Sequence, residues 1–131
     1  MREWGLGLAS QYILRLARKR WRIRAYRKQH ELRSIVDRTD RFASDGILLF
    51  STLRNERVRL PYFLRYYRDL GVNHFLIVDN DSDDGSREFL EMQPDVSLWT
   101  TKHSYKRSRF GVDWLNWLQM KYAHEHWALV V

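Results

Sequence analysis

Short apolar runs alternate with segments of helical periodicity from residue 44 to the end of the chain, and this alternation restricts the fold more than any other feature. The apolar runs cover residues 47–52, 74–78, 96–100 and 127–131, and the helical patterns between them cover residues 56–70, 86–92 and 112–126. Continuous apolar runs of this length are typical of strands buried on both faces. No hairpin signal joins two of them. The order β-α-β-α-β-α-β predicts an α/β fold with a doubly wound, mainly parallel sheet.

Prolines, glycines and a serine mark the ends of the predicted helices. Pro61 is expected in the first turn of its helix, where a missing N–H is tolerated, and Gly71 is expected to end that helix. Ser86 is expected to cap the next helix, which Pro94 and Asp95 terminate.

A basic segment precedes the α/β part. Apolar residues recur at helical spacing over residues 8–37, and neither proline nor glycine occurs between Ala9 and Ser44, which predicts one long helix. Residues 1–41 contain 12 Lys/Arg and 4 Asp/Glu, whereas the remainder is close to neutral, so the net charge of +7 belongs to this segment. We therefore divide the chain into a basic helical arm (residues 1–43) and an α/β domain (residues 44–131).

Three interpretations of the arm remain open: a solvated helix packed on the domain, a helix on an anionic membrane surface, and a nucleic-acid-binding helix. Basic residues with Leu14 and Trp21 opposite them suit anionic headgroups. No nucleic-acid reading motif accompanies the charge, so no nucleic-acid partner is expected. The chain has no cysteine, no secretory h-region and no apolar run of the roughly 18–20 residues that a membrane-spanning helix needs. These features predict a cytoplasmic protein, associated peripherally with the inner face of the membrane.

Polar clusters follow the first two predicted strands, at the end of the sheet where parallel α/β folds bind ligands. The first cluster, residues 52–56, offers a hydroxyl, a guanidinium, an amide and a carboxylate. Such a set suits a base, a ribose and a phosphate. The alternative is a helix N-terminus, with Asn55 as its cap and Glu56 stabilised by the helix dipole.

The second cluster, residues 79–85, carries four carboxylates within six residues. A calcium-binding EF-hand loop does not match, because Asp84 stands at the sixth position, where glycine is required, and Leu90 at the twelfth, where glutamate is required. An Asx-rich turn that leads into the helix at Ser86 is one interpretation. Mutual repulsion of four negative charges favours the other, a loop that binds a ligand.

Few other residues suggest a catalytic, metal-binding or phosphate-binding role. Neither a G-x-G-x-x-G fingerprint nor a Walker-type loop is present. His124 and His126 stand two residues apart and would not face each other on a helix, which favours surface or core histidines over a metal site. Arg107 and Arg109 precede the last helix, either in a solvated loop or within reach of a diphosphate.

Two motifs, each directly after a predicted strand, resemble a known family. The run Thr52-Leu53-Arg54-Asn55-Glu56 is followed by the helical segment 61–72 and by the run Asp79-Asn80-Asp81-Ser82-Asp83-Asp84-Gly85. Together they resemble the family 2-type glycosyltransferases of the GT-A fold, in the branch with an R-N-E first loop and a D-N-x-S-x-D-G second loop. The resemblance covers about residues 46–131. Residues 114–116 and 126–131 are similar to the segment that precedes the family's metal-binding D-x-D motif.

The resemblance implies the N-terminal half of a GT-A nucleotide-diphospho-sugar-binding domain, in an enzyme that moves a sugar from such a donor to a glycan acceptor. Thr52 would lie near the uracil or ribose of the donor, and Asp79 or Asn80 would contact the base or ribose. Many relatives have two adjacent aspartates at the latter positions. Nine residues are expected at the donor: Thr52, Arg54, Asn55, Glu56, Asp79, Asn80, Asp81, Asp84 and Arg109.

The family's catalytic groups are expected outside this sequence. Its D-x-D motif holds a divalent cation, Mg²⁺ or Mn²⁺, across the donor diphosphate, and a later aspartate is the general base of an inverting displacement. The resemblance places the D-x-D motif within a few positions after Val131. We therefore expect no catalytic or metal-binding residue in residues 1–131, weak nucleotide binding, and no sugar transfer by these residues alone. The alternative to an enzyme is a non-catalytic nucleotide- or membrane-binding α/β module.

Overall fold

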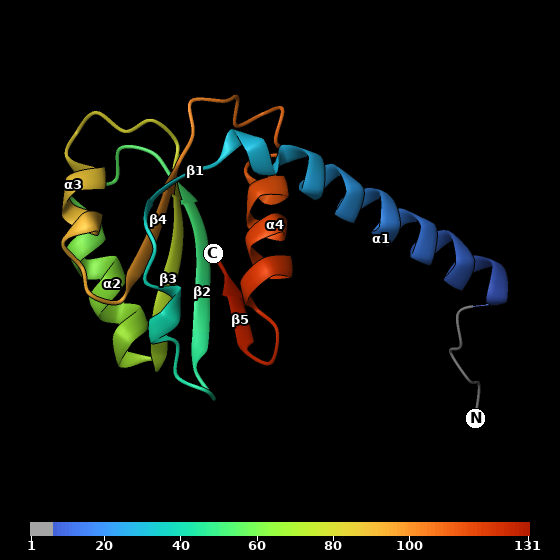
Figure 1. The fold of residues 1–131 in the computed structure, drawn as a ribbon, viewed down its shortest axis with the longest axis horizontal. Coiled ribbons are helices and arrows are strands. Elements are labelled where there is room, and N and C mark those ends of the chain that lie inside the picture. Colours follow the sequence, from blue (N-terminus) through green and yellow to red (C-terminus); the bar gives the residue numbers. More distant parts are fainter. Residues whose placement is uncertain (1–6) are drawn as a thin grey trace.

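Three buried parallel strands form the centre of the fold. The computed structural model describes residues 7–131 of the chain. The whole sheet has five strands: β1 (Arg33–Val36), β2 (Ile47–Leu53), β3 (Val72–Asp79), β4 (Val96–Thr100) and β5 (Trp127–Val130). The three central strands are β2, β3 and β4. β2, β3 and β4 pair in parallel, β5 pairs in parallel with β2, and β1 pairs antiparallel with β4. The order across the sheet is β1-β4-β3-β2-β5 (Figure 1). The predicted α/β fold with a mainly parallel sheet is confirmed.

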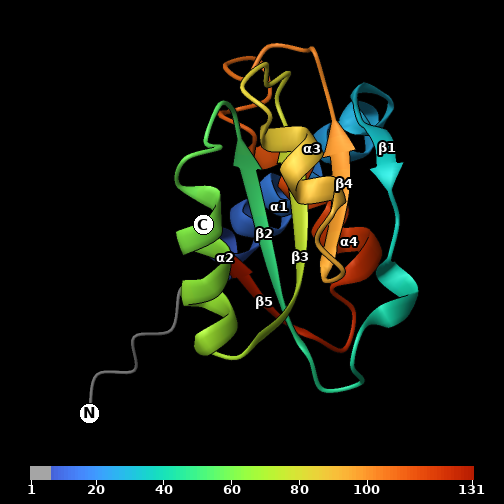
Figure 2. The same cartoon turned by 90° about the vertical axis from the view of Figure 1, so that its left-hand side faces the viewer.

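Helices cover both faces of the sheet, as a doubly wound fold requires. They are α1 (Leu8–Lys28), α2 (Leu60–Asp69), α3 (Ser86–Glu91) and α4 (Val112–Tyr122), with the 3-10 turns η1 (Gln29–Glu31) and η2 (Thr39–Arg41). α2 and α3 lie in front of the sheet in Figure 2, and α4 lies behind it. Side chains alternate between the two faces along a strand. One core therefore surrounds Leu49 and Ile77 beneath α2 and α3, and the other surrounds Phe50 and Trp114 beneath α4.

The single helix predicted for residues 8–37 is wrong, because α1 ends at Lys28 and helical structure ends with the 3-10 turn η1 at Glu31. Residues 33–36 instead form β1, so this part of the predicted arm belongs to the sheet. The physical reason lies in tertiary contacts, because residues 33–36 pair with β4 and α4 covers the side chain of Glu31. Its carboxylate accepts a hydrogen bond from the Trp114 indole (2.8 Å) and pairs with Lys28 (2.8 Å). Residues 1–6 of the predicted arm lie outside the described residues.

The contacts of Glu31 also determine its charge. Burial acts to raise the pKa of this carboxyl, but the hydrogen bonds from Lys28 and Trp114, together with the charges of Lys28 and His103, hold the pKa below its ordinary value of 4.5. Glu31 is therefore ionised at neutral pH, and it links the end of α1 to the core beneath α4.

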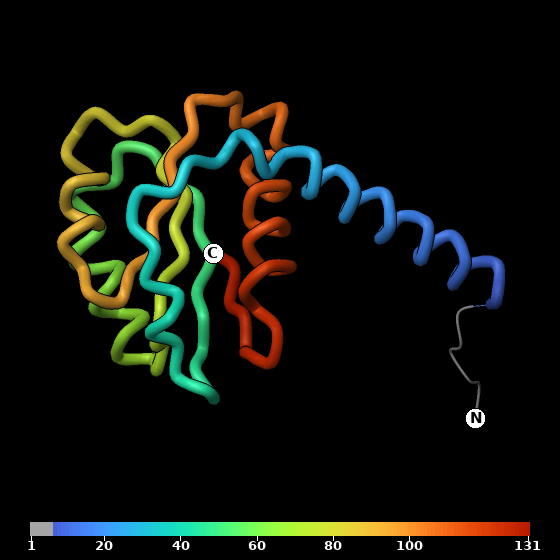
Figure 3. Tube along the Cα trace, in the orientation of Figure 1, coloured from blue at the N-terminus to red at the C-terminus, as the bar shows by residue number. Residues whose placement is uncertain are grey.

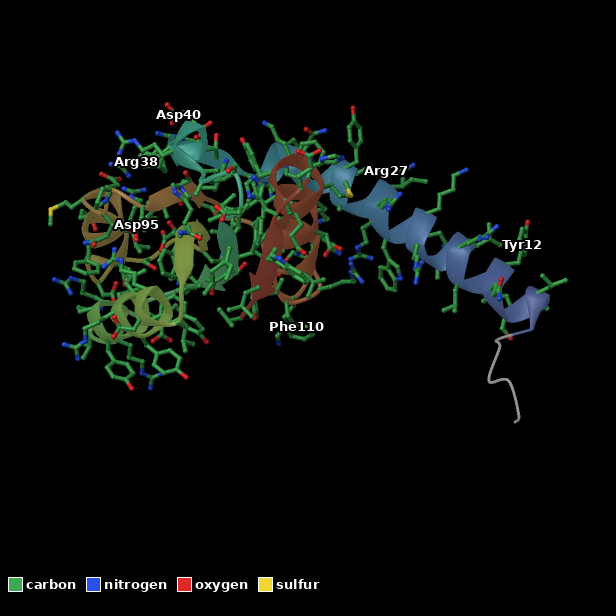
Figure 4. The ribbon with its side chains drawn as sticks, turned by 90° about the horizontal axis from the view of Figure 1, so that it is seen from below. Tyr12, Arg27, Arg38, Asp40, Asp95 and Phe110 are labelled. Atoms are coloured by element: carbon green, nitrogen blue, oxygen red, sulfur yellow. The ribbon has the colours of Figure 1, made fainter. Side chains whose placement is uncertain are left out.

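α1 is attached to the body of the protein by its C-terminal turns. Arg24 pairs with Asp113, which is fully buried (2.7 Å), and the guanidinium of Arg109 lies 3.6 Å from the ring centroid of Trp21. Among the residues of this helix, Ala25 alone is buried. The N-terminal turns extend away from the sheet and α4, and Tyr12 lies far from the body (Figure 4).

The other element ends differ from the predicted ones by a few residues. The helix predicted from residue 56 begins at Leu60, with Pro61 in its first turn as predicted. Gly71 follows that helix with a φ of 103°, a backbone conformation that suits the predicted stop. The helix predicted to reach residue 126 ends at Tyr122. β5 lies at the edge of the sheet, and all four of its residues are exposed.

Candidate functional site

The loops that follow β2, β3 and β4 meet at one end of the sheet. Residues 54–59, 80–85 and 101–111 leave the carboxyl ends of these parallel strands, and the tube in Figure 3 shows the three loops together there. Open α/β sheets bind ligands at this end. Both polar clusters that the sequence singles out therefore lie on the ligand-binding side of the sheet.

The first two of these loops are held together by hydrogen bonds in which three consecutive backbone amides of one loop donate to side chains of the other. The four bonds are Asn55 N–H to Ser82 Oγ (2.9 Å), Glu56 N–H to Ser86 Oγ (3.0 Å), Arg57 N–H to Asp84 Oδ2 (3.0 Å) and, in return, Asp83 N–H to Asn55 Oδ1 (2.9 Å). A loop amide outside regular structure needs such a partner or water. The two loops thus fold as one interlocked pair.

This pairing gives Asn55 and Asp84 structural roles. The alternative interpretation of Asn55, as the cap of α2, does not hold, because Arg59 occupies the N-cap position and Asn55 instead bonds the second loop. The predicted cap at Ser86 is also wrong, since Gly85 occupies the N-cap position of α3 and Ser86 is its first helical residue. The hydroxyl of Ser86 donates to Asp84 (2.5 Å), and this bond is the main cause that lowers the pKa of Asp84 below its ordinary value.

A cavity of about 600 Å³ opens at the end of β2, beside the first turns of α2. Its lining combines cationic, amide, hydroxyl and apolar side chains: Ser51, Thr52, Leu53, Arg54, Glu56, Arg59, Leu60, Phe63, Asn80, Tyr105 and Val131. The volume lies within the range of about 300–1,000 Å³ that is typical of small-molecule sites. Thr52, Arg54, Glu56 and Asn80 are four of the nine predicted site residues.

Asn80 joins this cavity to the loop 101–111. Its side-chain amide donates hydrogen bonds to the carbonyl oxygens of Thr101 and His103 (3.1 Å each), and its backbone N–H donates to Leu53 (2.8 Å). Both amide hydrogens are therefore used within the protein. Asn80 Oδ1 accepts no hydrogen bond from residues 7–131 and is the part of this side chain that a ligand can bind.

Two buried oxygen atoms near the cavity, Thr52 Oγ1 and Asp79 Oδ1, have no hydrogen-bond partner among the described residues. The backbone of Gly111 covers the Thr52 hydroxyl so closely that a Cβ at that glycine would stand 2.8 Å from Oγ1. Asp79 is 1% exposed, and its second carboxylate oxygen accepts the N–H of Ser82 (3.2 Å). Neither unpartnered oxygen is open to solvent in this conformation of the loops.

The remaining predicted site residues lie elsewhere. Arg109 donates to Asp113 (2.7 Å) and stacks on Trp21, so it lines a separate pocket between α1 and α4 and does not reach the cavity at β2. Asp81 is exposed, with a φ of 59°, which aspartate tolerates better than most residues. The structure therefore brings together four of the nine predicted residues.

Sequence reasoning missed Arg59 and Tyr105, which also line the cavity. Arg59 pairs with Glu56 (3.5 Å) and directly precedes α2, whereas the helix predicted from residue 56 would have included it. Tyr105 comes from the loop after β4, and no local pattern in the sequence connects it with Thr52 or Asn80. Its place follows from the hydrogen bonds between Asn80 and that loop.

No three acidic or histidine side chains converge on a position suited to a metal ion within residues 7–131. Glu56 is the one carboxylate of the cavity lining, and it pairs with Arg59. The side chains described here do not fit the divalent cation that the family resemblance implies.

Comparisons of the chain with protein-family models, with curated proteins and with solved structures found no match. None of the helices in the described part of the chain combines the length and the apolar character that crossing a bilayer requires.

Proposed function

We propose that this domain binds the nucleotide part of a nucleotide-diphospho-sugar, as the donor-binding half of a family 2-like glycosyltransferase of the GT-A fold that acts on a glycan acceptor. The cavity at the end of β2 supports the proposal most directly, because Thr52, Arg54 and Asn80 from the two family-like motifs line it together. The loops that carry these motifs follow neighbouring parallel strands, where such folds bind nucleotides.

The chemistry of the lining suits this class of ligand. Arg54 and Arg59 supply two exposed guanidinium groups, which pair well with phosphate oxygens. Phe63 and Tyr105 supply apolar surface for a base or sugar ring. The free oxygen of Asn80 suits a donor group such as an imide N–H of uracil or a ribose hydroxyl.

Nucleotide titration of the 131-residue chain tests the proposal. UDP, UDP-sugars and inorganic phosphate are titrated into the protein by calorimetry, with and without Mg²⁺. We expect weak binding of UDP, and an affinity about tenfold lower in Arg54→Gln and in Arg59→Gln, because a hydrogen bond to a charged group contributes about 1.5–3 kcal/mol. Both side chains are exposed, so the changes should leave folding intact.

The control is Arg65→Gln, which removes the same charge from an exposed residue of α2 outside the cavity lining. Its UDP affinity should match that of the unchanged protein. The proposal fails if UDP does not bind at millimolar concentration, or if all three variants bind it equally well.

A further inference from the structure

One side of α1 is fixed by its contacts with the body of the protein. The residues of this helix that are shielded are Ala17, Ala25 and Lys28, and Trp21 of the same row lies beneath the guanidinium of Arg109. These four positions are spaced by four, four and three residues, so they share one side of the helix. That side faces the body.

The row on roughly the opposite side of α1 is apolar. With about 100° between successive residues, Leu8, Tyr12, Leu16 and Ile23 lie within one sector, roughly opposite Ala17 and Ala25. Tyr26 lies at the edge of the same sector, and its ring contacts Trp117 of α4. Their exposed fractions are 86%, 64%, 44% and 42%. Helices of globular proteins ordinarily turn their apolar side toward the core. Here the row Leu8, Tyr12, Leu16 and Ile23 is exposed, on a helix whose N-terminal turns extend away from the sheet (Figure 1, Figure 4), and Ile13 and Leu14 are exposed on other sides of the same turns.

The same helix is strongly cationic. It contains eight Lys/Arg and no Asp/Glu. Arg24 and Lys28 pair with carboxylates of the body, and the other six have no acidic partner among residues 7–131. By helical periodicity, Arg15 and Arg22 border the apolar row on one side and Arg20 borders it on the other. Lys19 lies within the row, where its long alkyl stem is compatible with an apolar contact.

We propose that α1 binds the surface of a bilayer that contains anionic phospholipids, with the row Leu8, Tyr12, Leu16 and Ile23 inserted among the headgroups and the flanking arginines on the lipid phosphates. An apolar row bordered by cations is the arrangement that helices in the membrane interface use. A nucleic acid would satisfy the positive charge but would leave Leu8, Leu16 and Ile23 without a partner. The apolar row therefore favours lipid. This inference concerns a surface separate from the cavity and does not depend on the proposed donor binding.

Cosedimentation of the full chain with vesicles tests the inference. The vesicles are phosphatidylcholine alone and an equal mixture of phosphatidylcholine and phosphatidylglycerol, at about 0.1 M salt, where charges interact over about 10 Å. We expect binding to the mixed vesicles and little binding to phosphatidylcholine alone. Each cation near an anionic surface contributes about fivefold in affinity, so replacing Arg15, Lys19, Arg20 and Arg22 with glutamine should weaken binding about 100-fold or more. Glutamine keeps a high helix propensity.

A second variant isolates the apolar row. Changing Leu8, Tyr12 and Leu16 to serine leaves the charge unaltered and should weaken binding at least about tenfold through lost apolar contact. Two variants serve as matched controls: Arg65, Lys102, Lys106 and Lys121 to glutamine for charge, and Val58, Leu70 and Met92 to serine for exposed apolar surface on the body. Both controls should bind vesicles like the unchanged protein. All substituted residues are exposed, and circular dichroism verifies folding in each case.

Three results would overturn the inference: equal binding to both kinds of vesicle, unchanged binding after the three serine substitutions in α1, or equal losses in the control variants. Duplex DNA is titrated in parallel. Binding to DNA that matches vesicle binding in affinity and is insensitive to the serine substitutions would identify α1 as a general polyanion-binding helix instead.

Discussion

Replacing Gly111 with alanine tests directly how the loop before α4 is seated on β2. Gly111 has a φ of 80°, a conformation that costs an L-residue about 1–2 kcal/mol. A Cβ at this position would also stand 2.8 Å from Thr52 Oγ1 and 3.0 Å from Thr52 Cβ. Forcing atoms into such a contact costs about 1–3 kcal/mol. We therefore expect the free energy of unfolding to fall by about 2–5 kcal/mol in Gly111→Ala.

Gly71 provides a matched control, because its φ is 103° and a Cβ there would have nothing within 4 Å. Gly71→Ala has the conformational cost without the steric one. Alanine reduces the entropy of the unfolded chain equally in both variants, so that contribution cancels in the comparison. The difference between the two variants, about 1–3 kcal/mol, measures the contact with Thr52.

Urea unfolding followed by tryptophan fluorescence is the assay, with a lower midpoint and an unchanged slope as the expected result. Combining Gly111→Ala with Thr52→Ala removes Oγ1 and Cγ2, two of the three atoms closest to the added Cβ, and should restore part of the lost stability. If Gly111→Ala lowers the free energy of unfolding no more than Gly71→Ala does, the loop 101–111 does not pack on β2 as described, and Gly111 does not cover the Thr52 hydroxyl.

Two further predictions concern buried charge. Asp113 is fully buried and pairs with both Arg24 and Arg109 (2.7 Å to each), so Asp113→Asn should lower the free energy of unfolding by about 3 kcal/mol. Asp95→Asn is the control, because the pair of Asp95 with Arg68 is partly exposed. A loss of stability in Asp113→Asn no larger than that in Asp95→Asn would contradict the prediction. Burial is the main cause that lowers the pKa of His74 from 6.5 to about 4. Because the unfolded chain then binds this proton more readily than the folded one, stability should fall by about 3 kcal/mol as the pH drops from about 6.5 to about 4. His74→Gln should lack that part of the pH dependence in urea unfolding, and an unaltered pH profile would refute the assignment.

The central strands could be predicted because their signal is local. Residues 48–51 and 74–79 are buried, and burial on both faces of the sheet favours the apolar runs 47–50 and 75–78 that these strands contain. β1 gave no such signal, since its four residues are exposed or half-buried and its apolar positions continue the helical spacing of α1. What makes β1 a strand is pairing with β4, for example between Arg33 and Thr100. Such a long-range partner cannot be read from a local pattern.

The candidate site could be predicted in part for the same reason. Thr52, Arg54 and Asn80 directly follow strands, so their place at the carboxyl end of the sheet follows from the topology alone. Arg109 lies in a loop whose course depends on Asp113 and Trp21, and these contacts turn its side chain toward α1. Tyr105, from the same loop, reaches the cavity instead. Periodicity and composition do not show that Arg109 lies toward α1 while Tyr105 lies at the cavity.

The interlocked pair of loops has a consequence for mutagenesis. The amides of residues 55–57 depend on Ser82, Asp84 and Ser86, so the segment that carries Arg54 and Glu56 holds its shape through atoms that do not line the cavity. Local opening should release both loops as one cooperative unit. Substitutions at Asp84 and Arg54 should therefore show epistasis, with a combined effect that differs from the sum of the single ones. A loss of binding after a substitution in residues 79–85 is therefore explained by a change in the shape of the first loop, and does not by itself show that the substituted residue contacts the ligand.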